Sequence, residues 1–239
     1  MPILRSLSKC ILTHSFSRGG SQCADVRVLR TSMRNKSTLT AMNPNQPNTL
    51  PPTYFDDVYR ANADPWQFET SPYEREKYAT TLAALPRPHY ERAFEIGCSL
   101  GVLTEQLAPR CGHLLAVDVA QAPLKRAQQR CAQLPQVEFR LMRVPEEFPE
   151  GQFELILVSE VGYYWSPEDL TRATEQILAA LPSGGQLLLV HWTPPVHDYP
   201  LTGDEVHEFF LRKAEADGPL RHVHGQRHEQ YRLDLLEKR

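Results

Sequence analysis

Five short apolar segments alternate with stretches of helical pattern from Pro51 onward, and this alternation constrains the fold more than any other feature of the chain. Turn-forming residues bound each segment, as expected for strands joined by helices in a parallel sheet. Several segments are apolar almost throughout, which is typical of strands covered on both faces. The five predicted strands are Arg92–Ile96, Leu114–Val119, Val137–Met142, Phe153–Ser159 and Gly185–Trp192.

Three helix starts carry the pattern of a capping box, in which a Ser or Thr and an acid three residues later satisfy each other's backbone N–H groups. They lie at Ser71–Glu74, Ser166–Asp169 and Thr202–Glu205. The last two predicted strands, Leu220–Gln226 and Tyr231–Glu237, are separated by so few residues that they can pair only as an antiparallel hairpin. We therefore predict an α/β fold, a Rossmann-like doubly wound sheet of seven strands with helices on both faces and an antiparallel C-terminal hairpin. This arrangement resembles that of the class I methyltransferases.

The first 50 residues differ in composition from the rest of the chain. They hold seven Lys and Arg against a single Asp, are rich in Ser, Thr and Asn, and show little apolar periodicity. We predict a disordered basic tail over residues 1–50 and one folded domain over residues 51–239. The tail is either a transit-like segment or translated sequence upstream of a true start at Met33 or Met42.

Charge and cysteine usage narrow the class of protein. The whole chain has a formal charge of -3, so the part beyond the basic tail is acidic, which argues against a nucleic-acid substrate. No apolar run approaches the length of a membrane span. The five cysteines form no Cys-x-x-Cys pair, which predicts neither a disulfide framework nor a zinc site and favours a reducing cytoplasm. We expect no metal, and the sequence indicates no oligomeric state.

A glycine-containing segment lies where the first predicted strand turns into a helix. It reads Glu95-Ile-Gly97-Cys98-Ser-Leu-Gly101, and glycine allows a ligand to approach the backbone closely. Asp118 follows Gly97 by 21 residues, at the end of the second predicted strand, where a carboxylate can accept hydrogen bonds from both ribose hydroxyls of a nucleoside. The close glycine pair of dinucleotide-binding loops is missing. Glu95 suits the ammonium group of S-adenosyl-L-methionine and would repel a pyrophosphate, so we predict S-adenosyl-L-methionine as the cofactor.

A second cluster, residues 159–165, follows the fourth predicted strand and belongs to the same carboxyl edge of the sheet. Glu160 is suited to accept a proton from an amine acceptor or to hold that amine in place. Tyr164 and its aromatic neighbours either stabilise a cation through their ring faces or cover the sheet edge. His191, near the end of the fifth predicted strand, is either a second base or a hydrogen-bonded core histidine. The candidate catalytic residues are therefore Glu160, His191 and Tyr164.

These motifs together resemble one family, the nodulation protein S family of S-adenosylmethionine-dependent methyltransferases. The matching segments are Asp64–Tyr78, Thr81–Pro86, Glu95–Thr104, Leu115–Asp118, Ser159–Tyr164, Gly184–Trp192, Asp198–His207 and Tyr231–Leu236. The resemblance implies N-methylation of the amine that is exposed by deacetylating the non-reducing end of a chitin-type oligosaccharide, as in nodulation-factor biosynthesis. The expected partner is accordingly a small-molecule or oligosaccharide amine acceptor.

The resemblance also implies which residues bind the cofactor. Gly97, Gly101, Asp118 and Glu160 carry over as cofactor contacts, and the stretch Trp66–Tyr78 is implied to lie over the cofactor through Trp66, Tyr73 and Tyr78. Glu95 and Cys98, in the same segment as the two glycines, complete the candidate cofactor-binding residues. One departure concerns adenine, because no acid follows the third predicted strand. We expect main chain and apolar contact at Met142, Arg143 and Val144 to hold adenine instead. Two alternatives stay open: an O- or N-methyltransferase for an unrelated metabolite, and a catalytically silent methyltransferase-like partner protein.

Overall fold

The computed structural model describes residues 48–239, so the predicted tail lies outside the described residues except for its last three positions. Two of these three positions contact the domain. The Leu50 backbone N–H donates to the Tyr164 carbonyl at 2.9 Å, and the Ser166 backbone N–H donates to Thr49 Oγ1 at 2.8 Å. Contacts with the domain therefore extend to Thr49, two positions before the predicted boundary.

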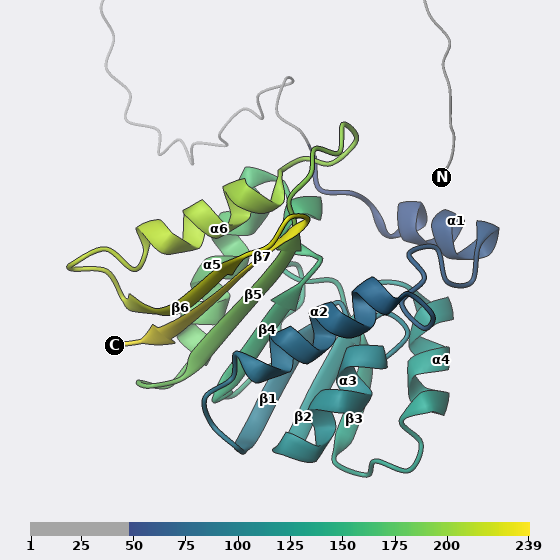
Figure 1. Cartoon of the computed structure of the whole chain (residues 1–239), viewed down its shortest axis with the longest axis horizontal. Coiled ribbons are helices and arrows are strands. Elements are labelled where there is room, and N and C mark those ends of the chain that lie inside the picture. The colour runs from purple at the N-terminus through teal and green to yellow at the C-terminus, as the bar shows by residue number, and fades with distance from the viewer. Residues whose placement is uncertain (1–47) are drawn as a thin grey trace, which may run out of the picture. The chain divides into compact units, whose positions relative to one another are not determined.

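Seven strands form one sheet in the order β3-β2-β1-β4-β5-β7-β6 (Figure 1). β1 to β5 pair in parallel, whereas β7 is antiparallel to both β5 and β6. This confirms the predicted doubly wound sheet with its antiparallel C-terminal hairpin. The strands are β1 (Tyr90–Ile96), β2 (Cys111–Asp118), β3 (Val137–Leu141), β4 (Leu155–Ser159), β5 (Gln186–Trp192), β6 (Leu220–Arg227) and β7 (Tyr231–Lys238).

The strand boundaries differ from the predicted ones by a few residues. β1 and β2 begin earlier than predicted because the parallel ladder between them already starts at Tyr90 and Cys111. β4 begins later, at Leu155, because the backbone N–H of Phe153 donates to the carbonyl of Ala180 rather than to a neighbouring strand. These contacts join segments that are distant in sequence, and local pattern does not report them.

Six α-helices connect or flank the strands in the described part of the chain. They are α1 (Pro52–Ala61), α2 (Pro72–Ala83), α3 (Val102–Leu107), α4 (Gln121–Arg130), α5 (Pro167–Ala180) and α6 (Gly203–Arg212), with short 3-10 turns η1 (Ala108–Arg110) and η2 (Gly162–Tyr164). Within residues 48–239, no helix has the length and apolar character needed to cross a membrane.

The predicted capping boxes are correct in full only for α6, where Thr202 and Glu205 bond reciprocally. Ser71 and Ser166 do accept a bond from the third residue of their helices, but the reciprocal bond is missing at both. Competing partners explain the difference. The Glu74 carboxylate bonds to Lys77 instead, and the Asp169 carboxylate bonds to Thr49 and Arg172.

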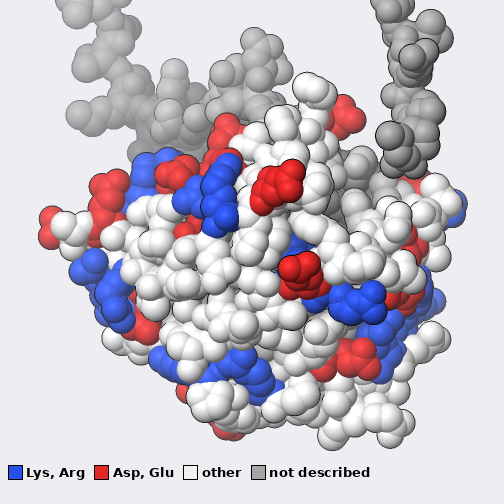
Figure 2. All heavy atoms as spheres, viewed as in Figure 1, with Lys and Arg blue, Asp and Glu red and all other residues white. Residues whose placement is uncertain are grey.

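Helices cover both faces of the sheet, α5 and α6 on one and α2, α3 and α4 on the other (Figure 1). Alternate strand residues supply the two cores: Leu115 and Ile156 pack with the helices of the first face, and Leu114 and Leu155 with those of the second. The surface carries charges of both signs, interspersed on the face shown in Figure 2. Both faces are occupied by helices, so the carboxyl edge of β1, β2, β4 and β5 is the place for a ligand.

Candidate active site

The segment between β1 and α3 forms a tight turn that requires glycine. Gly97 and Gly101 have φ of 82° and 73°, in the left-handed region that favours glycine. The N–H groups of Gly97 and Cys98 both donate to the carbonyl of Val117 in β2, at 2.8 and 2.9 Å. A Cβ at Gly97 would collide with the side chain of Val161, and one at Gly101 with Ala127. Glycine is therefore required at position 97 both by the backbone conformation of the turn and by the close packing against Val161.

Asp118 ends β2 beside this turn, as predicted. Its Oδ2 accepts the Ser99 backbone N–H and its Oδ1 the Ala120 backbone N–H, each at 2.9 Å. Burial raises the pKa of Asp118 to about 6, although these backbone hydrogen bonds oppose the rise. A carboxylate offers about four acceptor positions, so each oxygen can still accept a hydroxyl. Leu141, the partner of Asp118 across the ladder, is 51% exposed and adds an apolar surface at the same edge.

An aromatic cover lies over the turn. The Tyr59 hydroxyl of α1 shares a hydrogen bond of 2.5 Å with Ser99 Oγ, and its ring packs edge-on against Trp66 at 5.6 Å between centroids. Trp66 in turn stacks on Phe68. Trp66 was predicted here, whereas Tyr59 was missed. The spacing of Phe55 and Tyr59, four residues apart in α1 and both buried, was the available signal.

Glu160 follows β4 and is the centre of a buried polar cluster. Its Oε1 accepts Lys77 Nζ at 2.7 Å, and its Oε2 accepts both the Tyr163 hydroxyl at 2.6 Å and the Trp192 backbone N–H at 2.9 Å. Lys77 also donates to Glu74 Oε1 at 3.0 Å. The cluster therefore joins α2 to the carboxyl ends of β4 and β5.

Lys77 is the cation of this cluster, and its side chain is 3% exposed. Burial lowers the pKa of Lys77, but the Glu160 and Glu74 carboxylates outweigh burial and raise it well above its ordinary value. Lys77 Nζ also lies 5.1 Å from the centroid of the Tyr73 ring. Burial raises the pKa of Tyr78, and the charges of Glu74 and Glu160 raise it further. Tyr73 and Tyr78 thus lie beside the Glu160 cluster.

The role of Lys77 was missed from the sequence. The signal was the spacing of Glu74, Lys77 and Tyr78, which places three polar groups on one face of α2.

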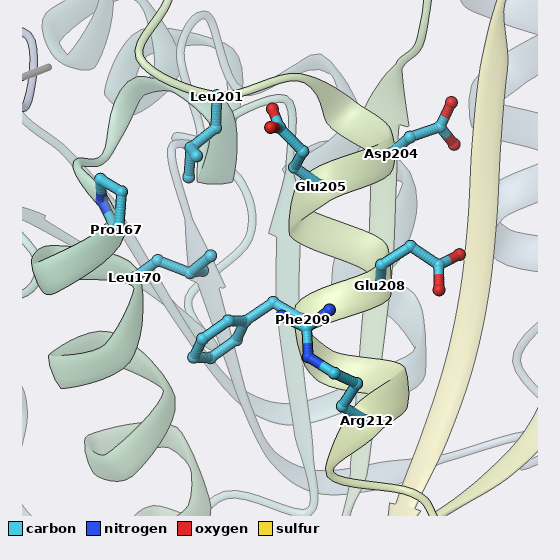
Figure 3. Close-up of a pocket in the computed structure, with 8 residues that line it drawn as sticks. All are labelled: Pro167, Leu170, Leu201, Asp204, Glu205, Glu208, Phe209 and Arg212. Carbon is cyan, nitrogen blue, oxygen red and sulfur yellow. The ribbon is translucent and has the colours of Figure 1, made fainter. Parts of the chain in front are cut away.

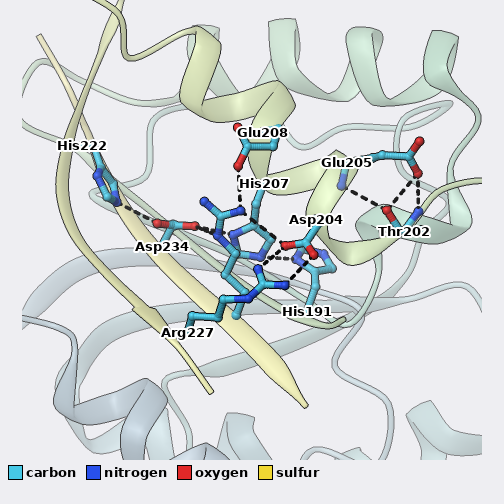
Figure 4. A network of polar contacts seen from close by, with 10 residues as sticks. His191, Thr202, Asp204, Glu205, His207, Glu208, His222, Arg227 and Asp234 are labelled. Atoms are coloured by element: carbon cyan, nitrogen blue, oxygen red, sulfur yellow. Dashed lines mark hydrogen bonds and ion pairs between the residues drawn. The ribbon is translucent and has the colours of Figure 1, made fainter. Parts of the chain in front are cut away.

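His191 lies in a chain of buried hydrogen bonds (Figure 4). The Gly162 backbone N–H donates to His191 Nε2 at 3.1 Å, so the proton of the neutral ring is on Nδ1, which donates to His207 Nε2 at 3.1 Å. His207 Nδ1 then donates to Asp234 Oδ2 at 2.6 Å. Burial holds the pKa of His191 well below its usual value. Since protein groups occupy both ring nitrogens, the structure matches the alternative of a hydrogen-bonded core histidine.

Two further predicted residues face other protein groups. Tyr164 is buried and packs edge-on against Phe55 and Tyr199, with centroids 4.9 and 4.8 Å apart, so it covers the sheet edge. Glu95 is buried in β1, and its Oε2 accepts the Thr104 hydroxyl at 2.6 Å. Its carboxyl therefore faces α3 in this structure.

The three residues predicted to hold adenine point in different directions. The Met142 backbone N–H donates to the Asp118 carbonyl at 3.0 Å, which places Met142 at the carboxyl edge of the sheet. Arg143 forms an ion pair with Glu146 at 3.2 Å. The Val144 side chain lies in the core. Met142 is thus the member of the three that lies beside Asp118.

A groove of about 440 Å³ lies elsewhere, between α5 and α6 (Figure 3). It is lined by Pro167, Leu170, Leu201, Asp204, Glu205, Glu208, Phe209 and Arg212, and includes none of the predicted site residues. Its acids are engaged, Asp204 with Arg227 and Glu208 with Arg232. Among residues 48–239, no three His, Cys, Asp or Glu side chains are arranged to hold a metal ion. The candidate site is therefore the carboxyl edge of the sheet.

Known proteins share this fold and these motifs. The family model for nodulation protein S (NodS) matches residues 57–192, which is more than half of the chain. The chain belongs to the nodulation protein S family. The nodulation protein S of Rhizobium tropici is 32% identical over 127 residues, 52% of this chain and 53% of that protein. The matches to two further nodulation proteins S cover 49% and 59% of those proteins. The chain therefore spans about half the length of the curated relatives it matches.

Solved structures extend the family likeness over a larger part of the chain. The crystal structure of the N-methyltransferase NodS from Bradyrhizobium japonicum WM9, in complex with S-adenosyl-L-homocysteine, aligns with a TM-score of 0.68 and 25% identity. That alignment covers 77% of this chain and 97% of the NodS chain. A candidate methyltransferase from Pseudomonas syringae aligns with a TM-score of 0.61 and 37% identity, over 70% of this chain and 99% of that one. The predicted family and the class I methyltransferase fold are both confirmed.

Proposed function

We propose that this chain is an S-adenosyl-L-methionine-dependent methyltransferase that methylates the nitrogen of an amine acceptor. The acceptor class we propose is the free amine of a deacetylated chitin-type oligosaccharide or a related amino sugar. One observation carries the proposal: the Gly97–Gly101 turn, Asp118 and the Glu160 cluster lie at the same carboxyl edge. The N-methyltransferase activity of the NodS relative and its complex with S-adenosyl-L-homocysteine support it.

The residues of this edge fit the cofactor. Asp118 keeps acceptor positions for ribose hydroxyls, and Leu141 and Met142 offer apolar surface and main chain for adenine. Tyr59 and Trp66 form an aromatic cover over the turn. When bound, S-adenosyl-L-methionine supplies a methyl group activated by its positive sulfonium.

The Glu160 cluster fits an amine acceptor. Its two carboxylates, Glu74 and Glu160, outnumber the single ammonium of Lys77, so a second cation is favoured beside them. We assign Glu160 to positioning the acceptor amine, and Tyr164 to the wall behind it. His191 fixes the Gly162 turn and takes no proton from the acceptor, since both of its ring nitrogens are occupied.

The proposed setting is the cytoplasm. Among the described residues, Cys98, Cys111 and Cys131 are free and buried. Thiols that remain unpaired are typical of a reducing compartment.

The test is transfer of a labelled methyl group to matched acceptors. These are a chitin oligomer deacetylated at its non-reducing end, the same oligomer fully acetylated, and simple amines and hydroxy acids. We expect methylation of the deacetylated oligomer and none of its fully acetylated form, because an amide nitrogen shares its lone pair with the carbonyl. Transfer to oxygen would support the other methyltransferase alternative, and failure to bind S-adenosyl-L-methionine in calorimetry would support the silent partner protein.

A cofactor-site variant makes this test specific. Asp118→Asn should weaken S-adenosyl-L-methionine binding by about 1.5–3 kcal/mol, as for the loss of hydrogen bonds to a charged group. The exposed Asp217→Asn is the matched control and should leave binding unchanged. Equal affinity in both variants would refute the assignment of the ribose site to Asp118.

A further inference from the structure

Glu160 is poorly placed to accept a proton. Both of its oxygens are engaged, Oε1 by Lys77 and Oε2 by the Tyr163 hydroxyl and the Trp192 backbone N–H. Oε2 already accepts two hydrogen bonds, and the position left on Oε1 lies beside the Lys77 ammonium group, which repels an incoming proton. The cluster therefore holds Glu160 as a fixed hydrogen-bond acceptor.

Glu74 differs from Glu160 in this respect. The residue is 6% exposed, and its Oε2 is buried with no hydrogen-bond partner among the described residues. Lys77 Nζ lies 3.0 Å from Oε2 as well, but only Oε1 receives it with hydrogen-bond geometry. Buried polar atoms are nearly always hydrogen-bonded, and Oε2 has close contact with Lys77 but keeps an acceptor position that no described residue fills with hydrogen-bond geometry.

The neighbour of Glu74 in sequence shows the same feature. The Tyr73 hydroxyl is also buried and has no hydrogen-bond partner within residues 48–239. The Tyr73 ring packs edge-on against Trp192, at the end of β5, and against Tyr231, at the start of β7. These contacts place the first turn of α2 at the carboxyl edge of the sheet, where the acceptor is proposed to bind.

The charges around Glu74 favour both a cation and a proton. The titratable groups that face its carboxyl are Lys77, Glu160 and the hydroxyls of Tyr73 and Tyr78. Burial raises the pKa of Glu74, and Lys77 opposes this rise only in part. Glu74 thus holds a proton more readily than an exposed glutamate.

We propose that Glu74 is the proton acceptor for the amine substrate, with Lys77 and Glu160 as positioning residues. This inference rests on the proposed N-methyltransferase function. The acceptor enters as an ammonium, its proton passes to Glu74 Oε2, and the neutral amine is left with its lone pair. That lone pair forms the new N–C bond as the C–S bond breaks, and the bonding electrons of the C–S bond stay on sulfur. Glu74 later releases its proton to solvent.

The test compares Glu74→Gln and Glu160→Gln over pH 6–10 on the deacetylated chitin oligomer. Glu74→Gln should lower kcat about 10²- to 10⁴-fold near pH 7, and this loss should shrink above the amine pKa of about 7.7–8.0. Glu160→Gln should mainly raise KM and keep the wild-type shape of the pH profile. Glu76→Gln, an exposed glutamate in the same helix, is the matched control and should behave as wild type.

A second readout needs no cofactor and no turnover. Acceptor affinity measured by calorimetry should fall about 10- to 100-fold in Glu74→Gln, because a hydrogen bond to a charged group is lost. A melting curve verifies folding, and Glu74→Asp, which retains the charge but shortens the side chain, should show a weaker form of the same kinetic defect.

Two outcomes would overturn the proposal: a Glu74→Gln variant with normal kcat, or a pH-dependent loss that appears in Glu160→Gln instead. Either would refute only the role of Glu74. Failure of the wild-type protein to methylate any amine would refute the proposed function itself.

Discussion

Replacing the buried carboxyl of Glu95 by an amide should stabilise the domain at alkaline pH. Glu95 is enclosed in β1, and its Oε2 accepts the Thr104 hydroxyl. Burial raises the pKa of Glu95 to about 7 from an ordinary value of 4.5, and the charge of Asp118 adds to this rise, while the bond from Thr104 opposes it. Between these two pH values the folded chain binds more protons than the unfolded chain. The stability that this preference contributes is complete below pH 4.5 and is lost as the pH rises through 7.

The interval from 4.5 to about 7 sets the size of the effect. At about 1.4 kcal/mol per pH unit it corresponds to about 3 kcal/mol of unfolding free energy at pH 8. Glu95→Gln keeps an acceptor for Thr104 but adds buried N–H donors, which cost about 1 kcal/mol. We therefore expect a net gain of about 1–2 kcal/mol at pH 8 and a small loss at pH 5.

Urea unfolding at pH 5 and pH 8 measures this difference. Glu91→Gln is the matched control, since Glu91 lies in the same strand but is exposed, and it should change stability little at either pH. A Glu95→Gln variant that loses stability equally at both pH values would refute the reasoning, because the penalty for burying the charge would then be absent.

Three further predictions concern the polar clusters. Lys77→Met should lower the free energy of unfolding by about 3–5 kcal/mol, because the buried Glu74 and the partly buried Glu160 lose their cation; a loss below about 1 kcal/mol would mean that these ion pairs are solvated. Gly162→Ala should cost about 1–3 kcal/mol in urea unfolding, because its Cβ would lie 2.7 Å from Val206 Cγ1 and 2.9 Å from His191 Nε2. The lowered pKa of His191 means that the unfolded chain binds the extra proton below pH 6.5, so stability is complete above that pH and falls below it. His191→Gln should flatten this fall between pH 6.5 and 5, and an unchanged slope would contradict the assignment.

Local patterns predicted the parts of the site that depend on one strand and its turn. The glycines of the Gly97–Gly101 turn and the acid of Asp118 are set by backbone conformation and by the end of a strand, and both are visible in a short window of sequence. The parallel sheet and its terminal hairpin follow from apolar runs and connection lengths in the same way.

The polar clusters were not predictable in this manner, because their partners are far apart in sequence. Lys77 meets Glu160 across 83 residues, and this long-range contact fixes the Lys77 ammonium group that Glu74 bonds in place of a reciprocal capping bond. Whether His191 is a base or a core residue likewise depended on Gly162 and His207, on other elements. Residue type alone left both alternatives open.

The hydrogen-bond chain of His191 has a consequence for the order in which the domain is assembled. The backbone N–H of Gly162 can only donate, so the proton positions on His191 and His207 are both fixed. The series of hydrogen bonds must therefore end on an acceptor, which is Asp234 of β7. The turn that carries Tyr163 towards Glu160 is therefore anchored by a strand that a ribosome makes more than 60 residues later. Until β7 is in place, the turn of residues 162–164 lacks the last acceptor of this hydrogen-bond chain. The proposed methyl transfer should thus depend on β7 as well as on the parallel strands whose carboxyl ends carry the candidate site.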